Sequence, residues 1–405
     1  MGALLVRLGG VKVGVLECFG DESQEFTFCD EYCSALIGAR PVLGQIFEDR
    51  FPHPISVGGP ICWFAHLLPQ GVMRRWRSRL LGLDEDDTFG LLQQLGSNMP
   101  GAIVLAPTEP ILRTQFTEPN ARIESPASDV SPFRFSLAGA QWKLSARSSG
   151  RGLTTGAKAQ GTEYIAKFHA PEYPDLPQCE FATMNWARAA GLSIPAFTLR
   201  NVADFDQIPE EMPTGDGTVF VIERFDREDG ERIHIEDFGQ ILDRPPGDAQ
   251  YHGSYEEIAS VIRWIAPEST TDFLKSIVFN VICGNGDAHL KNFSVIYPDG
   301  RNALLTPGYD IVSTFLFFPP GKEQLALSLN ANRQFRSIGL HCFSQLFELL
   351  GMANDTGEGM VKDFADATVS AWCQSEVQSG FTSKQIDRIS GHLYALPLLN
   401  DLRLP

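Results

Sequence analysis

Two carboxylates and one amide in the second half of the chain have the residue types of a metal site. Asp287 follows a Gly-Asn-Gly break, Asn292 comes five positions later, and Asp310 follows a predicted hairpin. That hairpin consists of an apolar run, a Pro-Asp-Gly turn and a short return strand, so it brings Asp310 back to the end at which Asp287 and Asn292 lie. Carboxylate and amide oxygens form a hard site, which suits Mg²⁺ held jointly with the phosphates of a substrate.

The same three residues have the spacing of a phosphoryl-transfer site. The catalytic loop of protein kinases has the pattern D-x-x-x-x-N, followed by a strand pair and a metal-binding Asp. In that chemistry the first Asp accepts the proton of the attacking hydroxyl, while the Asn and the second Asp hold metal ions. This pattern predicts Asp287 as the base and Asn292 and Asp310 as metal ligands. The competing interpretation is structural, with Asp287 and Asn292 as loop caps and Asp310 as a helix N-cap.

Upstream segments supply the other parts that such a site needs. Lys167 ends a predicted strand whose Y-I-A-K run is similar to the V-A-I-K of kinases, and Glu180 opens a predicted helix over 179–192, where it would pair with Lys167. Small residues within 136–143 allow backbone N–H groups to approach phosphate oxygens. The apolar strand in 219–228 ends in charged residues, which fits either an adenine-binding hinge or an ordinary strand edge.

The predicted secondary structure around these segments changes along the chain. Near the N-terminus, alternating apolar residues around Gly9 and Gly10 predict two strands. The Gly- and Ser-rich stretch 145–162 lacks the Walker A order and predicts a flexible loop rather than a nucleotide site. From about residue 250 the spacing of apolar residues becomes helical, and the helix over 271–283 is apolar enough to be central and buried.

Chain length and net charge limit the classes of protein to which this sequence can belong. The 405 residues predict two or three domains, and 43% hydrophobic residues can bury a sizeable core. The formal charge of −17 argues against nucleic-acid binding by the whole surface. No uncharged apolar run approaches the roughly 20 residues of a membrane span. Arg7 and Lys12 interrupt the N-terminus, and the eight cysteines are dispersed, so we expect a cytoplasmic protein.

In this order, the segments resemble those of the HipA family of serine/threonine kinases, which are toxin components of bacterial toxin–antitoxin modules. The resemblance covers essentially the whole chain. It runs through residues 63–77, 91–107, 135–145, 164–168, 179–195, 221–228, 284–295, 305–313 and 325–331.

Each matching residue takes a role by resemblance. Asp287 would be the catalytic base, Asn292 and Asp310 the magnesium ligands, and Glu180 the ion-pair partner of Lys167. The ATP-binding residues would be Leu137, Ala138, Gly139, Ala140, Gln141 and Lys143 in the phosphate loop, Lys167, His289 and Lys291 at the phosphates, Glu223 and Phe225 in the hinge, and Tyr309 near the nucleotide. Ser136 matches a serine that family members autophosphorylate, where a dianionic phosphate would compete with ATP.

The resemblance also implies a fold and partners. It implies an α+β fold of two kinase-like lobes, with an N-terminal subdomain over 1–110, a linker over 111–130, an N-lobe over 131–228 and a mainly helical C-lobe over 229–405. ATP and Mg²⁺ would be the cofactors, an aminoacyl-tRNA synthetase a target, and a helix-turn-helix antitoxin of HipB type the partner that contacts DNA.

Two other functions fit the same residues. One is a catalytically silent binding module within an antitoxin or repressor complex. The other is a phosphotransferase that acts on a small molecule or a lipid, because the metal and phosphate residues do not specify the acceptor.

Overall fold

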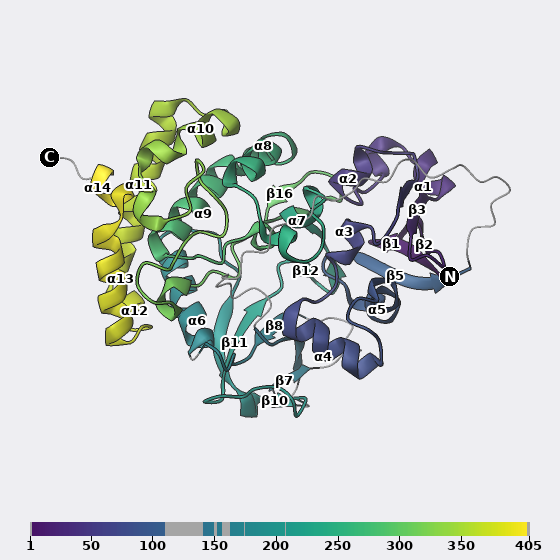
Figure 1. Cartoon of the computed structure of the whole chain (residues 1–405), viewed down its shortest axis with the longest axis horizontal. Helices are drawn as coiled ribbons and strands as arrows, with labels where there is room; N and C mark the ends of the chain where they lie inside the picture. The colour runs from purple at the N-terminus through teal and green to yellow at the C-terminus, as the bar shows by residue number, and fades with distance from the viewer. Residues whose placement is uncertain are drawn as a thin grey trace. The chain divides into compact units, whose positions relative to one another are not determined.

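The structure is a computed structural model. It describes residues 2–109, 141–149, 152–155, 163–173, 175–206 and 208–402 (Figure 1). The chain divides into two compact units. The first comprises residues 1–135, 228–250 and 296–302, and the second comprises residues 136–227, 251–295 and 303–405. The predicted linker and Ser136, Leu137, Ala138, Gly139 and Ala140 lie outside the described residues, and the predicted domain boundaries stay predictions.

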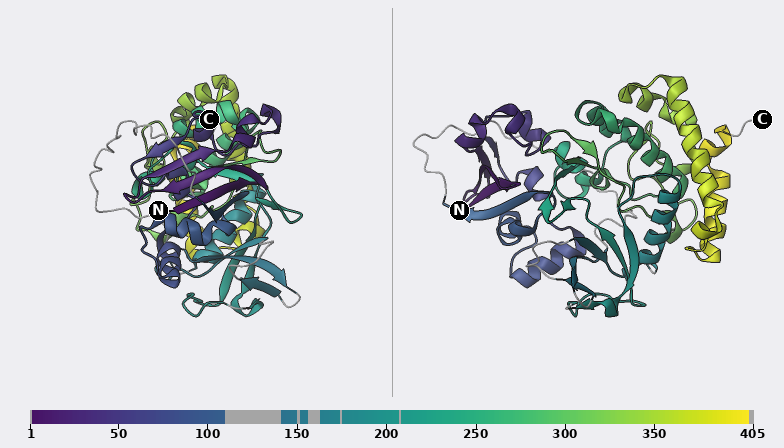
Figure 2. Two further views of the ribbon diagram at one scale, coloured as in Figure 1. Left: turned by 90° about the vertical axis from the view of Figure 1, so that its right-hand side faces the viewer. Right: turned by 180° about the vertical axis from the view of Figure 1, so that it is seen from behind.

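An antiparallel sheet with the order β4-β3-β2-β1-β5 forms the base of the first unit. Its strands are β1 (Gly2–Leu8), β2 (Val11–Cys18), β3 (Gln24–Phe28), β4 (Ile55–Val57) and β5 (Ile103–Thr108). Gly9 and Gly10 turn the chain between β1 and β2 with φ angles of 52° and 84°, in the left-handed region that favours glycine. The predicted pair of N-terminal strands is confirmed, and its purple strands lie side by side in the left view of Figure 2.

Short helices pack an aromatic core against this sheet. They are α1 (Asp30–Ser34), α2 (Gln45–Glu48), α3 (Cys62–Ala65), α4 (Gly71–Leu81) and α5 (Thr88–Leu95). Alternate residues of the strands, such as Leu4 and Val6, are buried with Phe26, Phe47 and Trp63. This period of two buries one side of the sheet.

A buried carboxylate joins three sequence segments of the first unit. Glu236 belongs to β14 (His234–Asp237), which precedes α7 (Phe238–Ile241). Its side chain accepts hydrogen bonds from Trp63 Nε1 at 2.8 Å, from the Tyr297 hydroxyl at 2.5 Å and from the backbone N of Gln45 at 3.1 Å. These bonds explain why residues far apart in the sequence belong to one unit.

The second unit contains a six-stranded sheet with the order β10-β7-β6-β8-β11-β9. Its strands are β6 (Lys143–Ser149), β7 (Gly152–Thr155), β8 (Tyr164–Lys167), β9 (Phe197–Asn201), β10 (Phe205–Asp206) and β11 (Thr218–Glu223). The prediction of a loop throughout 145–162 was wrong, because β6 and β7 pair as an antiparallel hairpin there. Leu144 and Ala146 are buried and alternate with polar residues, a strand pattern that the Gly and Ser content obscured.

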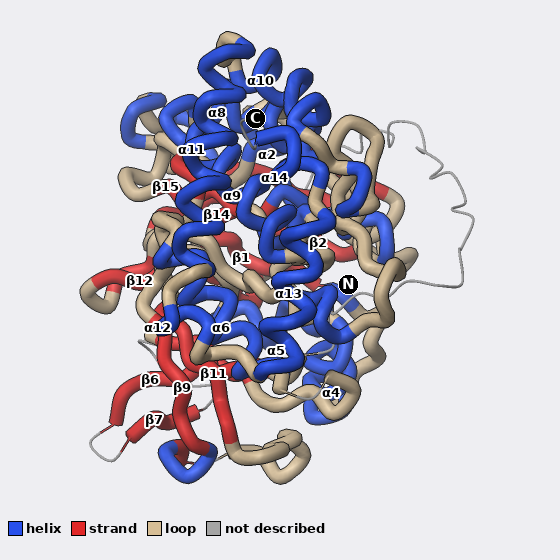
Figure 3. Tube along the Cα trace, turned by 90° about the vertical axis from the view of Figure 1, so that its left-hand side faces the viewer, coloured by secondary structure: helices blue, strands red, loops and turns tan. Residues whose placement is uncertain are grey.

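Helices form the remainder of the second unit. They are α6 (Leu176–Ala189), α8 (Tyr255–Ile265), α9 (Thr270–Cys283), α10 (Ser344–Leu350), α11 (Asn354–Trp372), α12 (Ser375–Gln378), α13 (Ser383–Ala395) and α14 (Pro397–Leu402). Figure 3 separates these blue helices from the red strands β6, β7, β9 and β11. The predicted central helix is confirmed, since α9 is buried from Ile277 to Cys283.

Trp186 of α6 ties three helices together. Its ring lies 5.5 Å from that of Phe279 in α9 and 4.9 Å from that of Trp372 in α11, and its Nε1 donates to the carbonyl of Thr368 at 2.8 Å. The helix starts at Leu176, three residues before the predicted start, with Pro177 in its first turn, where proline is tolerated. Within the part of the chain that the structure describes, no helix has both the length and the apolar content needed to cross a membrane.

Candidate active site

The loop after α9 depends on two glycines. Gly284 ends the helix with a φ of 70°, and a Cβ on it would lie 2.4 Å from Cδ1 of Phe315. A Cβ on Gly286 would lie 2.5 Å from the carbonyl oxygen of Gln324. The backbone N of Gly286 donates to Oγ1 of Thr314 at 2.7 Å. The Gly-Asn-Gly break therefore brings this loop close to the segment that follows Asp310.

A chain of amide side chains holds Asp287. The Nδ2 of Asn285 donates to Oδ1 of Asn280 at 3.0 Å, and Oδ1 of Asn285 accepts from the backbone N of Asp287 at 3.1 Å. Asn292 Nδ2 donates to the carbonyl of Asp287 at 2.7 Å. Asp287 itself is half-buried. A hydrogen bond therefore links Asp287 and Asn292, the two ends of the D-x-x-x-x-N pattern.

A hairpin carries the chain from Asn292 to Asp310, as predicted. Its strands are β15 (Ser294–Tyr297) and β16 (Leu304–Leu305), and the backbone N of Thr306 donates to the carbonyl of Ser294 at 3.0 Å. Asp310 has a φ of 53°, a left-handed conformation that Asp adopts more readily than most residues. It is therefore not the N-cap of a helix over the following residues.

Lys167 is the centre of the charged site. It is 2% exposed, and its Nζ contacts both Oε1 of Glu180 and Oδ1 of Asp310. Glu180 is fully buried, and its other oxygen accepts from Nε2 of Gln141 at 3.3 Å. The predicted pair Lys167–Glu180 is present in the structure, together with a second carboxylate from 143 positions further along the chain.

Mutual charge sets the protonation of this cluster. Burial disfavours the charged form of Lys167, but the charges of Asp310 and Glu180 outweigh it and hold the pKa of Lys167 above its usual value. Burial would likewise raise the pKa of Asp310, yet Lys167 and Lys143 lower it to about 2. Burial, together with the neighbouring charge of Asp310, raises the pKa of Glu180. At neutral pH, Asp310 is ionised and Lys167 is positively charged.

A second lysine stands beside the first. Lys143 of β6 lies directly opposite Lys167 in the antiparallel register of β6 and β8, so both side chains project from the same face of the sheet. Like charges in directly opposite positions destabilise a sheet unless an anion lies near them. Asp310 is such an anion, because the charges of Lys167 and Lys143 both lower its pKa.

The predicted hinge and Tyr309 lie together. Phe225 follows the end of β11, and its ring centroid lies 5.5 Å from that of Tyr309. The Tyr309 hydroxyl donates to the carbonyl of Lys291 at 2.9 Å and shares a 2.5 Å hydrogen bond with Ser294. Glu223 is exposed, and its backbone N donates to the carbonyl of Ala196 at 2.8 Å. The backbone N–H of Phe225 has no hydrogen-bond partner among the described residues.

His289 lies in the loop between Asp287 and Asn292. It is buried, and its ring centroid lies 4.7 Å from that of Tyr251. Its charge contributes to the lowered pKa of Asp310, after Lys167 and Lys143. Tyr173, which the sequence reasoning missed, is near Asp287, since burial and then the Asp287 charge raise its pKa.

Two further positioning groups were missed. Oγ1 of Thr183 in α6 donates to the carbonyl of Cys179 at 2.8 Å, accepts from the backbone N of Ser313 at 3.1 Å and lies 3.2 Å from Oγ of Ser313. This pair fixes the helix of Glu180 to the segment after Asp310. Asn280 is the other group, and its only signal in the sequence is a polar residue inside the apolar run of α9.

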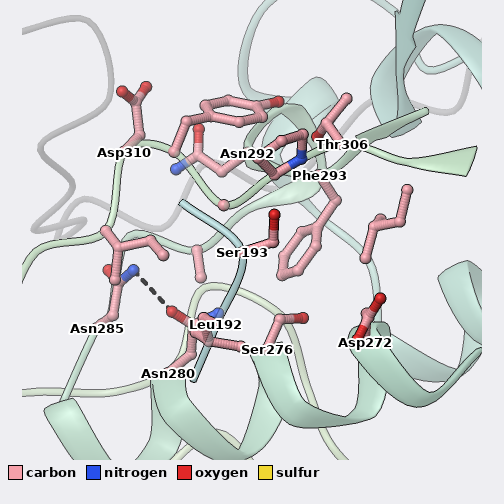
Figure 4. A pocket seen from close by; sticks show the side chains of 16 residues that line it. Leu192, Ser193, Asp272, Ser276, Asn280, Asn285, Asn292, Phe293, Thr306 and Asp310 are labelled. Carbon is pink, nitrogen blue, oxygen red and sulfur yellow. Dashed lines mark hydrogen bonds between the residues drawn. The ribbon is translucent and has the colours of Figure 1, made fainter. Parts of the chain in front are cut away.

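A cavity of about 150 Å³ adjoins the site, and both Asn292 and Asp310 line it. Figure 4 shows them on the side opposite α9, from which Asn280 and Ser276 extend. The structure thus places the two predicted metal ligands at one pocket.

Asn292 and Asp310 each have one side-chain oxygen available to a metal ion. Asn292 uses its Nδ2 on Asp287, and its Oδ1 has no partner among the described residues. Asp310 gives one oxygen to Lys167, and its Oδ2 has no partner there either. The described residues contain no group of three or more His, Cys, Asp or Glu side chains placed to hold a metal ion. Two oxygens are nevertheless sufficient where waters and substrate phosphates complete the shell of Mg²⁺.

The family follows from comparison with known proteins. The HipA-like C-terminal domain matches residues 135–372, and the HipA N-terminal domain matches residues 4–106. The chain belongs to the HipA family. The chain is 31% identical to Y4dM of Sinorhizobium fredii, which is named as a kinase, over 98% of this chain and 97% of that protein.

Shewanella oneidensis provides the other two comparisons with this HipA-family chain. Its serine/threonine-protein kinase toxin HipA is 28% identical over 72% of this chain and 71% of that protein. A structure of the Shewanella oneidensis HipA, HipB and operator DNA complex matches with a TM-score of 0.70 and 21% identity, and covers 99% of both chains. This match confirms the predicted two-lobed α+β fold.

Proposed function

We propose that this chain is an ATP- and Mg²⁺-dependent serine/threonine protein kinase. The observation that carries the proposal is the contact of buried Lys167 with both Glu180 and Asp310. A buried lysine held between a helix carboxylate and a candidate metal ligand has the arrangement that protein kinases use at the nucleotide phosphates. The relatives named as kinases support this assignment.

The residues divide the work of phosphoryl transfer. Lys167, Lys143 and Lys291 neutralise the negative charge of ATP. The unpartnered N–H of Phe225 would donate to adenine, with Tyr309 beside the ring. Asp287 orients the acceptor hydroxyl and takes its proton, while the hydroxyl oxygen bonds to the γ-phosphorus and the bond to the β,γ-bridging oxygen breaks to release ADP.

Asn292 and Asp310 would hold Mg²⁺, which neutralises charge developing on the transferred phosphoryl group. The chain's own contribution is to present the two oxygens. The bond from Asn292 Nδ2 to the carbonyl of Asp287 orients the amide and leaves Oδ1 available as a ligand.

The acceptors include the chain itself and a second protein. We propose Ser136 as the autophosphorylation site and an aminoacyl-tRNA synthetase as a protein target, by the family resemblance. The fold shared with a HipA that forms a complex with HipB and operator DNA supports a HipB-type antitoxin as partner.

Labelled ATP tests the proposal. Wild-type chain incubated with Mg²⁺ and γ-labelled ATP should incorporate label. Asp287→Asn is nearly isosteric and removes the acceptor charge, so incorporation should fall by about 10²- to 10⁴-fold while the unfolding free energy changes little. Asp366→Asn is the matched control, because Asp366 is exposed on α11 and should label like wild type.

The result also separates the other candidate functions. A folded wild-type chain that binds ATP in calorimetry but incorporates no label would be a silent binding module. Label that appears only on an added small molecule or lipid, and never on a protein, would identify a different phosphotransferase.

A further inference from the structure

Three aromatic side chains form a partly exposed group in the second unit, which we call the aromatic cluster. The ring centroid of Tyr173 lies 5.8 Å from that of Phe317 and 6.2 Å from that of Phe318. All three residues are half-buried. Phe315 of the same run is buried and stacks on His392, with 4.6 Å between the ring centroids. Packing in the core therefore accounts for Phe315 but leaves the aromatic cluster partly exposed.

Two observations place the aromatic cluster beside the loop of Asp287. The backbone N of Gly286, the residue before Asp287, donates to Oγ1 of Thr314 at 2.7 Å. Thr314 begins a short 3-10 helix that ends at Phe317. Burial raises the pKa of Tyr173, and the charge of Asp287 raises that pKa further. The cluster thus adjoins the residue that would accept the proton of the acceptor hydroxyl.

Arg388 of α13 fixes the backbone of this aromatic run. Its guanidinium donates to the carbonyl of Leu316 at 2.6 Å and to the carbonyls of Phe315 and Phe318 at 2.8 Å. The same guanidinium lies 3.4 Å from Oε1 of Glu323. Because one side chain holds three carbonyl oxygens, the two phenylalanines of the cluster are preorganised. A preorganised surface loses little conformational entropy when a ligand binds to it.

The proposed acceptor Ser136 has apolar neighbours in the sequence. Phe135 precedes it and Leu137 follows it. A serine presented to Asp287 would bring these neighbours to the aromatic cluster, because the cluster and Asp287 adjoin. Burial of an apolar side chain against the rings is favourable in proportion to the area removed from water. A charged side chain at the same place would lose hydration instead.

The charge near the aromatic cluster suits the same acceptor sequence. Arg134 lies two positions before Ser136. Glu172 is exposed and precedes Tyr173 in the chain. After burial and the charge of Asp287, the charge of Glu172 also contributes to the raised pKa of Tyr173. A basic residue that arrives with the serine would therefore meet carboxylates, and such complementary charges fix the register of binding.

We propose that the aromatic cluster binds the acceptor segment of a protein substrate, with an apolar side chain next to the serine packed against the rings and a basic side chain near Glu172. The cluster would select among serines by the residues that flank them, which the metal and phosphate residues do not do. Its role in phosphoryl transfer rests on the proposed function, but the binding itself needs no ATP.

Fluorescence anisotropy of a labelled peptide with the sequence of residues 131–142 tests this binding without ATP. The full-length chain should bind the peptide with a saturable curve. Phe317→Ala and Phe318→Ala should each weaken binding about 5- to 30-fold, the effect of losing part of one apolar contact. Trp264→Ala is the matched control and should bind like wild type, because Trp264 is 84% exposed on α8 and does not belong to the cluster.

Changes in the peptide keep the test independent of how the chain tolerates a substitution. The peptide with Phe135→Asp and Leu137→Asp should not bind, whereas Ser131→Ala, five positions before the acceptor, should leave binding unchanged. Arg134→Ala should weaken binding about 2- to 5-fold, and less in high salt. The proposal is overturned if the wild-type chain does not bind the peptide, if the doubly substituted peptide binds like the original, or if both phenylalanine variants bind like wild type.

Phosphoryl transfer to the same peptide separates this proposal from the proposed function. With ATP and Mg²⁺, Phe317→Ala should raise KM for the peptide as much as it weakens binding and leave kcat within about twofold, because the ring binds substrate without acting in the chemical step. Saturable peptide binding without any transfer would support the acceptor surface and contradict the kinase. Transfer that ignores both the flanking residues and the phenylalanines would support the kinase and overturn the acceptor surface.

Discussion

Among the described residues, each unit contains one fully buried glutamate, and the partners of these two side chains differ. Glu180 in the second unit faces a cation, because Lys167 contacts it and also contacts Asp310. Glu236 in the first unit accepts hydrogen bonds from neutral donors, among them Trp63 and Tyr297. The lysine of an ion pair can bind another anion in place of its carboxylate partner. A set of neutral hydrogen-bond donors instead holds one carboxylate in place. We infer that the first arrangement serves phosphate binding and the second serves folding.

The two buried glutamate sites also differ in the protonation of their carboxylates. Burial raises the pKa of Glu236 to about 7, although its hydrogen bonds act in the opposite direction. The Lys167 cluster instead keeps Asp310 ionised, with its pKa lowered to about 2. Lys167 and Asp310 thus stay charged across physiological pH, while Glu236 titrates near neutrality.

Replacement of Lys167, the buried cation, should produce the largest effect on stability and activity. Lys167→Met leaves Glu180 buried without its counter-charge, so the unfolding free energy should fall by about 3–5 kcal/mol and labelling by ATP should cease. Urea unfolding and incorporation of label measure the two effects.

A double variant separates stability from activity. Lys167→Met/Glu180→Met replaces the ion pair with apolar side chains and should recover most of the lost stability without recovering labelling. Recovery of labelling in the double variant would show that Lys167 acts only in folding.

The pH dependence of folding should isolate Glu236. Its folded-state pKa of about 7 lies above the usual value of 4.5. The folded state then binds the proton more tightly, so this contribution to stability is complete below pH 4.5 and is lost as pH rises through 7. Relative to Glu236→Gln, wild type should lose about 3 kcal/mol of unfolding free energy across that range, measured with urea at several pH values.

Histidines provide the control for this measurement. Burial lowers the pKa of His234 and of His392 to about 4. Their contribution has the opposite sign, because stability is lost as pH falls from 6.5 to 4. Both histidines are present in wild type and in Glu236→Gln, so they cancel in the difference. A difference that does not vary with pH would contradict the assigned role of Glu236.

We expect the smallest effect on stability from the loss of a single hydrogen-bond donor to Glu236. Tyr297→Phe removes the hydroxyl that bonds Glu236 at 2.5 Å and should lower the unfolding free energy by about 2 kcal/mol near neutral pH. Tyr394→Phe, at a residue that is 74% exposed, should change it little. Equal unfolding midpoints in urea for the two variants would show that the Glu236 network does not stabilise the first unit.

Local patterns predicted much of the site. The spacing of Asp287 and Asn292, the hairpin before Asp310 and the buried helix α9 all depend on neighbouring residues, and the structure contains each of them. The resemblance to the HipA family rested on such segments in order, and the comparisons confirm it. The roles of the individual site residues stay predictions.

Contacts between segments that lie far apart in the sequence could not be predicted from local sequence patterns. Lys167 lies 143 positions from Asp310, so no periodicity connects them. Asn280 is one polar residue in an apolar helix, and Glu236 lies in a charged strand with the appearance of a solvated edge. Their importance arises only when remote donors and acceptors meet in a site from which water is excluded. The β6–β7 hairpin was missed for another reason, because its glycines and serines masked the alternation of Leu144 and Ala146.

Mass spectrometry for phosphate on Ser136 tests the central claim most directly. After incubation with ATP and Mg²⁺, wild-type chain should carry phosphate on Ser136, and Asp287→Asn should carry none. This result would establish both phosphoryl transfer and the modified residue. A folded wild-type chain that binds ATP and yet gains no phosphate on any residue or added protein would contradict the assignment as a kinase.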